Sequence, residues 1–128
     1  MTLSIGTDIV EIARIKSVYE RQGQKIAERI LTPLERERFE QLPSDDIKIA
    51  FLAKRWCAKE AVAKALGTGI AKGVGFQQIQ INNNELGAPS IELFEGALER
   101  LQMLGGKQAL ISISDERHYA VAFCTVSE

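Results

Sequence analysis

Residues 51–70 read FLAKRWCAKEAVAKALGTGI, and this stretch decides the fold because it predicts a helix that is apolar on nearly every side. At about 100° per residue, its hydrophobic side chains leave no broad face for solvent. These side chains are Phe51, Leu52, Trp56, Ala58, Ala61, Val62, Ala63 and Leu66. Such a helix belongs at the centre of a domain. Its charged side chains need partners there, because an unpaired buried charge is costly.

The charges of this helix fall into two sectors. Glu60 and Lys64 are four residues apart and share one sector, while Arg55 and Lys59 share another. One interpretation is a core helix whose charges pair with neighbouring segments or extend to solvent. The alternative is a charged ligand, which the ending Gly67-Thr68-Gly69 favours because glycine tolerates positive φ and close approach. A phosphate would then lie beside Lys64, with Glu60 free to hold a cation.

The N-terminus carries a second group of candidate site residues. Leu3 and Ile5 alternate with polar residues, which predicts a short strand that stops at Gly6-Thr7 and leaves Asp8 at its end. A carboxylate there suits Mg²⁺, which takes one or two protein carboxylates and completes its shell with water and phosphate oxygens. The alternative is that Asp8 serves as the N-cap of the helical segment that follows.

Together the two segments resemble the holo-[acyl-carrier-protein] synthase family of 4'-phosphopantetheinyl transferases. The resemblance rests on Gly6-x-Asp8 followed by Arg14-Ile15, and on Trp56-x-x-Lys59-Glu60-Ala61-x-x-Lys64-Ala65. Further matching segments follow in the family's order: Thr32-Pro33-Leu34-Glu35, Phe76, Leu86-Gly87-Ala88-Pro89 and Ser112-Ile113-Ser114. The resemblance covers essentially all 128 residues and indicates a single domain, 1–128, of the small single-repeat branch.

The resemblance implies an activity and its site. The family moves 4'-phosphopantetheine from coenzyme A to a serine of apo acyl carrier protein and releases adenosine 3',5'-bisphosphate. It implies that Asp8 and Glu60 hold magnesium with the coenzyme A diphosphate, and that Lys64 lies against a diphosphate oxygen. Glu60 is also a candidate base for the serine, directly or through water, although a carboxylate that ligates a cation is a weakened base. We assign coenzyme A binding to Arg55, Lys64, Gly67, Thr68 and Gly69.

The segment after Asp8 predicts a docking surface for the carrier protein. Ile12, Ile15 and Tyr19 form its inward stripe, while Arg14 and Arg21 project from the opposite side. Exposed arginines on one helix are ordinarily a solvated face. Because acyl carrier proteins are acidic around the modified serine, the resemblance assigns docking to Arg14 and Arg21. It also implies a homotrimer with active sites in the clefts between subunits, and a role in fatty acid and lipid metabolism.

One departure from the family concerns the segment after Ser114. Some members carry a histidine there that is associated with the coenzyme A site, whereas this chain has Asp115. The only histidine, His118, comes three residues later, in a predicted hairpin turn before a strand. The family role therefore transfers to neither residue.

Composition excludes several classes of protein. A net charge of -1 gives no support to general nucleic-acid binding, and 45% hydrophobic with 26% charged residues is ordinary for a globular domain. No apolar run approaches the ~20 residues needed to span a bilayer, and the N-terminus lacks signal-peptide features, so we expect a cytoplasmic protein without a membrane partner. Cys57 and Cys124 lack the spacing of a metal pair.

Two other functions remain open at this point. A nucleotide-binding regulatory or scaffold protein would keep the phosphate site without transfer, but Asp8, Glu60 and Lys64 together argue against it. A metal-dependent phosphohydrolase would need the denser carboxylate or histidine set of a two-metal site.

The remaining segments predict an α+β fold with the long helix packed on a mostly antiparallel sheet. Thr32-Pro-Leu-Glu35 is a capping box for a short helix to about Leu42, and Ser44-Asp45 starts the long helix. Five further elements are expected: strands at 76–81 and 90–94, a helix at 95–104, and strands at 108–114 and 119–126 that complete the sheet.

Overall fold

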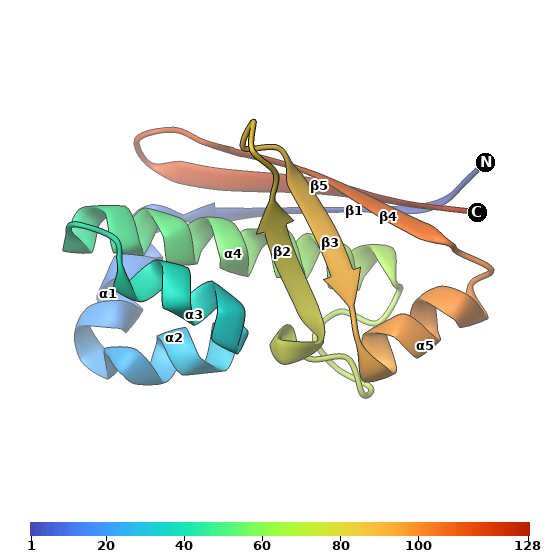
Figure 1. The fold of residues 1–128 in the computed structure, drawn as a ribbon, viewed down its shortest axis with the longest axis horizontal. Helices are drawn as coiled ribbons and strands as arrows, with labels where there is room; N and C mark the ends of the chain where they lie inside the picture. Colours follow the sequence, from blue (N-terminus) through green and yellow to red (C-terminus); the bar gives the residue numbers. More distant parts are fainter.

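The computed structural model describes residues 1–128, and its centre is helix α4, Asp45–Ala65 (Figure 1). The Ser44 side chain caps this helix by accepting a hydrogen bond from the Ile47 amide, and Asp45 and Asp46 occupy its first turn. Acidic residues there complement the positive end of the helix dipole. No helix of the structure is both long enough and apolar enough to cross a membrane.

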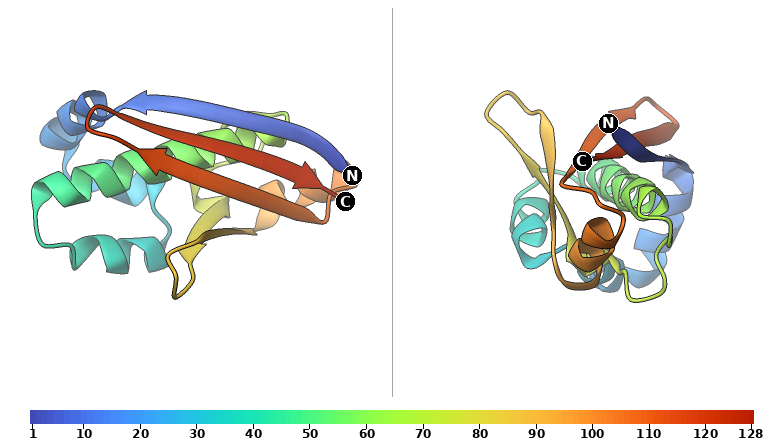
Figure 2. Two further views of the ribbon diagram at one scale, coloured as in Figure 1. Left: turned by 90° about the horizontal axis from the view of Figure 1, so that it is seen from above. Right: turned by 90° about the vertical axis from the view of Figure 1, so that its right-hand side faces the viewer.

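A three-stranded antiparallel sheet covers one side of α4 (Figures 1 and 2). Its order is β1-β5-β4, with bounds Thr2–Glu11, Tyr119–Ser127 and Gln108–Asp115. The inner face of β5 consists of the fully buried side chains of Ala120, Ala122, Cys124 and Val126, and these mostly small residues let α4 lie close to the sheet.

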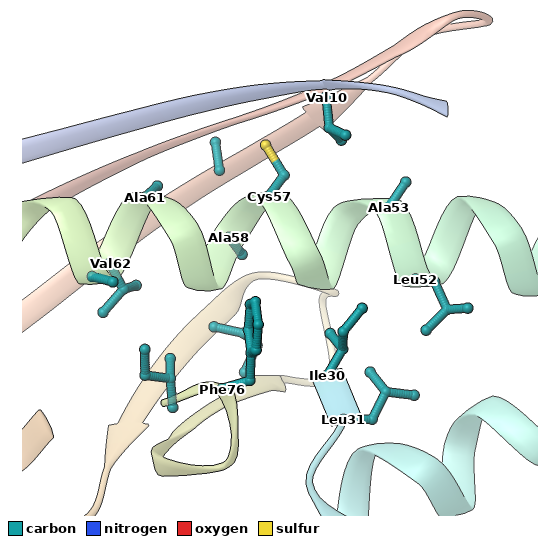
Figure 3. Close-up of a cluster of buried hydrophobic side chains, with 14 of the residues drawn as sticks. Val10, Ile30, Leu31, Leu52, Ala53, Cys57, Ala58, Ala61, Val62 and Phe76 are labelled. Atoms are coloured by element: carbon teal, nitrogen blue, oxygen red, sulfur yellow. The ribbon is translucent and has the colours of Figure 1, made fainter. Parts of the chain in front are cut away.

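The opposite side of α4 is covered by a mixed layer of helices and a β-hairpin (Figure 2). Its elements are α1 (Ile12–Gln22), α2 (Gln24–Ile30), α3 (Pro33–Glu40), the 3-10 turn η1 (Phe76–Gln78), β2 (Ile79–Asn83), β3 (Pro89–Leu93) and α5 (Glu95–Met103). Figure 3 shows both sides of the core: Cys57 and Val10 meet between α4 and the sheet, while Ile30, Leu31 and Phe76 pack beneath α4.

Gly6 sets the distance between β1 and α4. A Cβ atom at Gly6 would overlap the Ala61 carbonyl oxygen and lie 2.6 Å from the Ala65 amide nitrogen. The Ser4 hydroxyl donates a 2.5 Å hydrogen bond to the Ala65 carbonyl across the same contact. Backbone of the strand therefore touches backbone of the helix, which only glycine permits here.

The predicted α+β fold with a central helix is confirmed, with three differences in detail. The strands form two separate antiparallel sheets, because β2 pairs only with β3. Residues 76–78 are a 3-10 turn and not strand. The expectation that the first strand stops at Gly6-Thr7 is wrong: β1 continues to Glu11, so Asp8 lies inside the strand and caps no helix.

The predicted helix starts are confirmed at the level of individual hydrogen bonds. The Thr32 hydroxyl accepts from the Glu35 amide and the Glu35 carboxylate accepts from the Thr32 amide, at 3.3 and 2.8 Å, as a capping box requires. The helix that follows ends at Glu40, two residues earlier than expected. The hairpin turn at His118 is also present, because Asp115 pairs with Ala120.

Candidate active site

Asp8 and Lys64 meet across the contact between β1 and α4. Because side chains alternate along a strand, Gly6, Asp8 and Val10 all point to the α4 side. The Lys64 ammonium lies 3.0 Å from Asp8 Oδ1 and donates a second hydrogen bond of 3.1 Å to the Thr7 carbonyl. The Asp8 side chain is 17% exposed and that of Lys64 51% exposed, so solvent and ligands reach the pair from one side.

Glu60 is the second carboxylate of this cluster, one helical turn before Lys64. Burial raises its pKa, and the negative charge of Asp8 raises it further, while the positive charges of Lys64 and Arg29 lower it. None of the ion pairs within the chain involves the Glu60 carboxylate. Two carboxylates that repel each other are therefore held at one edge of α4, with a single lysine beside them. We call these residues the Asp8–Glu60–Lys64 cluster.

The residues of this cluster fit a magnesium ion that is shared with a phosphate ligand. A cation between Asp8 and Glu60 would relieve the repulsion that raises the pKa of Glu60. No three or more His, Cys, Asp or Glu side chains in the chain are grouped so that they could hold a metal ion by themselves. Two carboxylates are nevertheless what Mg²⁺ commonly takes from a protein when phosphate oxygens complete its shell.

Cys57 supports the cluster from behind. Its thiol donates a 3.0 Å hydrogen bond to the backbone carbonyl of Asp8 and lies fully buried between α4 and the sheet (Figure 3). Burial, reinforced by the charge of Asp8, raises the pKa of the Cys57 thiol to about 12. A thiol with such a pKa stays protonated and unreactive near neutral pH, so Cys57 acts as a structural donor.

The segment Gly67-Thr68-Gly69 ends α4 with the geometry that the glycines predicted. Gly67 and Gly69 have φ of +84° and +64°. The amides of Gly67, Thr68 and Gly69 all donate back to carbonyls of the last turn, those of Ala63 and Lys64. These amides are therefore occupied by helix capping. The contact of this loop with coenzyme A stays a prediction.

Arg55 does not lie in the Asp8–Glu60–Lys64 cluster. It comes five residues before Glu60, which turns it about 140° around the helix axis, toward α3 and β2. Its Nη2 donates 2.8 Å to Asn83 Oδ1, and its Nε lies 3.4 Å from Glu35 Oε2. Burial lowers the pKa of Arg55 to about 10. Arg55 borders a separate hollow of about 350 Å³ that Arg38 also lines.

The charges in the second sector of α4 meet protein partners. Lys59 is fully buried, and its ammonium lies 2.6 Å from Glu35 Oε1. Burial lowers the pKa of Lys59, and the negative charge of Glu35 opposes that change. Glu35, Arg55 and Lys59 form a buried cluster of charges. The sequence indicated that Arg55 and Lys59 need partners, but not that Glu35 is the partner. The capping box identified Glu35, yet nothing local in the sequence connected it to α4.

The predicted docking residues occupy the outer face of α1. Ile15 is buried and Ile12 and Tyr19 are partly buried against the core, which confirms the inward stripe. Arg14 and Arg21 are exposed and lie about two turns apart on the same side of the helix.

Comparison with known proteins identifies the family. A model of the 4'-phosphopantetheinyl transferase superfamily matches residues 4–124. The holo-[acyl-carrier-protein] synthase of Shewanella amazonensis is 57% identical to this chain over 120 residues, which are 94% of each chain.

Solved structures agree in fold over the whole chain. The holo-[acyl-carrier-protein] synthase from Neisseria meningitidis is 40% identical with a TM-score of 0.89, and the match covers 100% of both chains. A holo-(acyl-carrier-protein) synthase from Bacillus anthracis, crystallised in complex with coenzyme A (3',5'-ADP), is 34% identical with a TM-score of 0.83 and matches 100% of this chain and 99% of its own. The chain therefore belongs to the 4'-phosphopantetheinyl transferase superfamily.

Proposed function

We propose that the chain transfers 4'-phosphopantetheine from coenzyme A to a serine of apo acyl carrier protein. The proposal rests on family membership and, above all, on one observation. Asp8 and Lys64 lie 3.0 Å apart, with the Glu60 carboxylate close enough for its pKa to respond to both charges. Phosphoryl transfer depends mainly on positioning and on stabilising charge, which two carboxylates with a cation and one ammonium supply.

Each residue of the cluster has a proposed role in this reaction. Asp8 and Glu60 would hold magnesium, which when bound supplies positive charge against the diphosphate oxygens. Lys64 would donate to a diphosphate oxygen from its half-exposed position beside Asp8. Glu60 is foremost a ligand, because a carboxylate that coordinates a cation is a weakened base. The serine proton passes to Glu60, to a water or to another acceptor.

The outer face of the three-stranded sheet supports the proposed homotrimer. Its exposed apolar side chains are Leu3, Ile5, Ile9, Leu110, Tyr119, Val121 and Phe123. Ile9 lies directly opposite Val121 in the strand register, so part of this surface is continuous. Monomeric proteins rarely leave large apolar patches exposed. Arg55 lies outside the Asp8–Glu60–Lys64 cluster, so its proposed contact with coenzyme A would have to come from a neighbouring copy.

We expect the protein to have a native mass of three copies in solution, and Ile5→Lys to shift it to a monomer. Ile5 is 60% exposed on the outer sheet face, so the substitution disturbs no core packing, but it places a charge in the proposed interface. Native mass spectrometry of both proteins measures this. A monomeric parent protein, or a trimer that survives the lysine, would contradict this assignment of the interface.

Carrier recognition is expected to be electrostatic and to depend on α1. Arg14→Glu and Arg21→Glu should each raise the KM for carrier protein while direct binding of coenzyme A stays nearly unchanged. The reason is that each arginine can grip a carboxylate through two hydrogen bonds. Higher salt should act in the same direction, because the Debye length falls from about 10 Å at 0.1 M to about 3 Å at 1 M.

The exposed Lys107, which directly precedes β4, offers a matched control, since Lys107→Glu makes the same change in net charge away from α1. Steady-state kinetics against carrier concentration distinguish the two cases. If all three variants behave alike, or if none responds to salt, docking lies elsewhere on the molecule.

The proposed setting is the cytoplasm and the proposed pathway fatty acid synthesis. Both cysteines are free thiols that are buried in the fold, which is usual in a reducing compartment.

Release of adenosine 3',5'-bisphosphate tests the proposed function. Incubation with coenzyme A, magnesium and apo carrier should release it only when carrier is present. Release without carrier, together with free phosphopantetheine, would indicate hydrolysis. Binding of coenzyme A without any release would indicate a binding protein.

A further inference from the structure

Lys59 uses every hydrogen of a completely buried ammonium group. Its three acceptors are Glu35 Oε1 at 2.6 Å, the Ile30 carbonyl at 2.6 Å and the Phe76 carbonyl at 3.1 Å. An ammonium has three N–H donors, so each is used once. A buried ion pair is often no more stable than an apolar replacement of similar size. Stability alone therefore does not explain why Lys59 makes three directional hydrogen bonds, and we look for a role in positioning.

The carboxylate partner of Lys59 is fixed from several directions. Glu35 Oε2 accepts 2.9 Å from the Ile81 amide, and Oε1 accepts 2.8 Å from the Thr32 amide. Arg55 contributes a further positive charge, with Nε 3.4 Å from Oε2. The Glu35 side chain is 2% exposed. The Lys59 ammonium therefore occupies a fixed point beneath α4.

Through its two carbonyl contacts, Lys59 holds the ends of two segments together. Ile30 is the last residue of α2, and Phe76 is the first residue of the 3-10 turn η1. Figure 3 shows Ile30 and Phe76 packed together beneath α4. The side chain of Gln77 strengthens the same junction, because its Nε2 donates 2.6 Å to the carbonyls of Glu28 and Leu31.

This junction places an arginine and an aromatic ring against the side of α4 that carries Glu60. Arg29 directly precedes Ile30, and its guanidinium carbon lies 6.0 Å from the centre of the Phe76 ring. The Phe76 ring in turn lies 5.3 Å from the Trp56 ring of α4. We call Arg29 and Phe76 the second wall of the site, with β1 as the first. Trp56 lies one helical turn before Glu60 on the same side of α4, so the second wall stands next to the cluster.

We propose that Lys59 is a positioning residue for the transfer reaction: through Ile30 and Phe76 it fixes the second wall against the Asp8–Glu60–Lys64 cluster. The inference rests on the proposed function. Lys59 and Glu60 are consecutive in α4, so their side chains leave the helix about 100° apart. Glu60 thus lies in the site, while its neighbour Lys59 holds the second wall in place.

The variant Lys59→Met tests this role. Methionine fills similar space, and Glu35 keeps Arg55 and two backbone amides as partners, so the fold is expected to persist. We expect kcat to fall about 10- to 100-fold, since misplacement of about 1 Å costs this much. The KM for coenzyme A should change less than about twofold, because the cluster that binds its diphosphate is intact.

The matched control is Phe39→Leu, which weakens the core between α1, α3 and α4, away from the second wall. Both variants are assayed at a temperature where circular dichroism shows them fully folded. Lys59→Met at parental kcat would overturn the inference, as would an equal kcat loss in Phe39→Leu. An inactive parent protein would instead overturn the proposed function.

A second variant decides the matter if Lys59→Met does not fold. Gln77 is exposed, so Gln77→Leu releases the Glu28 and Leu31 carbonyls at the end of α2 without disturbing the core. We expect a smaller kcat loss with the KM for coenzyme A unchanged. In a folded double variant the two losses should be less than additive in free energy, because both act on one junction. Parental kcat in Gln77→Leu, with Lys59→Met unfolded, would overturn the inference.

Discussion

Asp8→Asn and Glu60→Gln are each expected to lower phosphopantetheine transfer by at least about 100-fold, equivalent to about 2.7 kcal/mol of transition-state stabilisation. Each removes one negative charge from a pair that repels itself within the folded chain, and so weakens the site for a divalent cation. The magnesium concentration needed for half-maximal activity should rise. The fold should persist, because Lys64, the ion-pair partner of Asp8, is half exposed.

The double variant examines whether the two carboxylates serve one ion. If they share a cation, the second substitution should add little to the first, because residues that act as a unit are strongly non-additive. Multiplicative losses would show that Asp8 and Glu60 act independently. Asp46→Asn, an exposed aspartate in the first turn of α4, provides the matched control and should leave magnesium dependence unchanged.

Gly6→Ala is expected to destabilise the protein by about 3 kcal/mol and to abolish most of its activity. The added methyl would collide with the backbone of Ala61 and Ala65, and neither peptide group can turn aside as a flexible side chain would. Separation of β1 from α4 also moves Asp8 away from Glu60. Thermal unfolding should show a Tm lower by roughly 10 °C.

Gly75→Ala is the matched control for this substitution. A Cβ at Gly75 meets no atom within 4 Å, and its φ of -129° suits any residue. Its Tm and transfer rate should match those of the parent protein. A Gly6→Ala protein with parental Tm would mean that β1 and α4 do not approach each other as closely as described.

The central helix and the cluster on its surface were predictable because their signals are local. The spacing of Glu60 and Lys64 follows from helix geometry alone, and the apolar residues around them required a central helix. Asp8 was identified as a candidate ligand, although the strand end expected at Gly6-Thr7 was wrong. Glycine stands at position 6 for close approach to α4 and not to end a strand.

What the sequence did not reveal depends on contacts between distant segments. Glu35 was recognised as part of a capping box, but its bonds to Lys59 and to the Ile81 amide join residues 24 and 46 positions away. The charge of Arg29 influences Glu60 only because α2 folds back beneath α4. The sequence indicated that a ligand could closely approach the backbone of Gly67–Gly69, but not that each amide donates a hydrogen bond within the last turn of α4. Local patterns do not contain such partners.

The intact mass of the carrier protein tests the central claim most directly. Apo acyl carrier protein is incubated with the purified protein, coenzyme A and magnesium, and then weighed by mass spectrometry. The account predicts that the carrier gains the mass of one phosphopantetheine group on a serine, and that Asp8→Asn and Glu60→Gln slow this gain. Carrier that remains unmodified after long incubation with folded protein, across several candidate carriers, would contradict it.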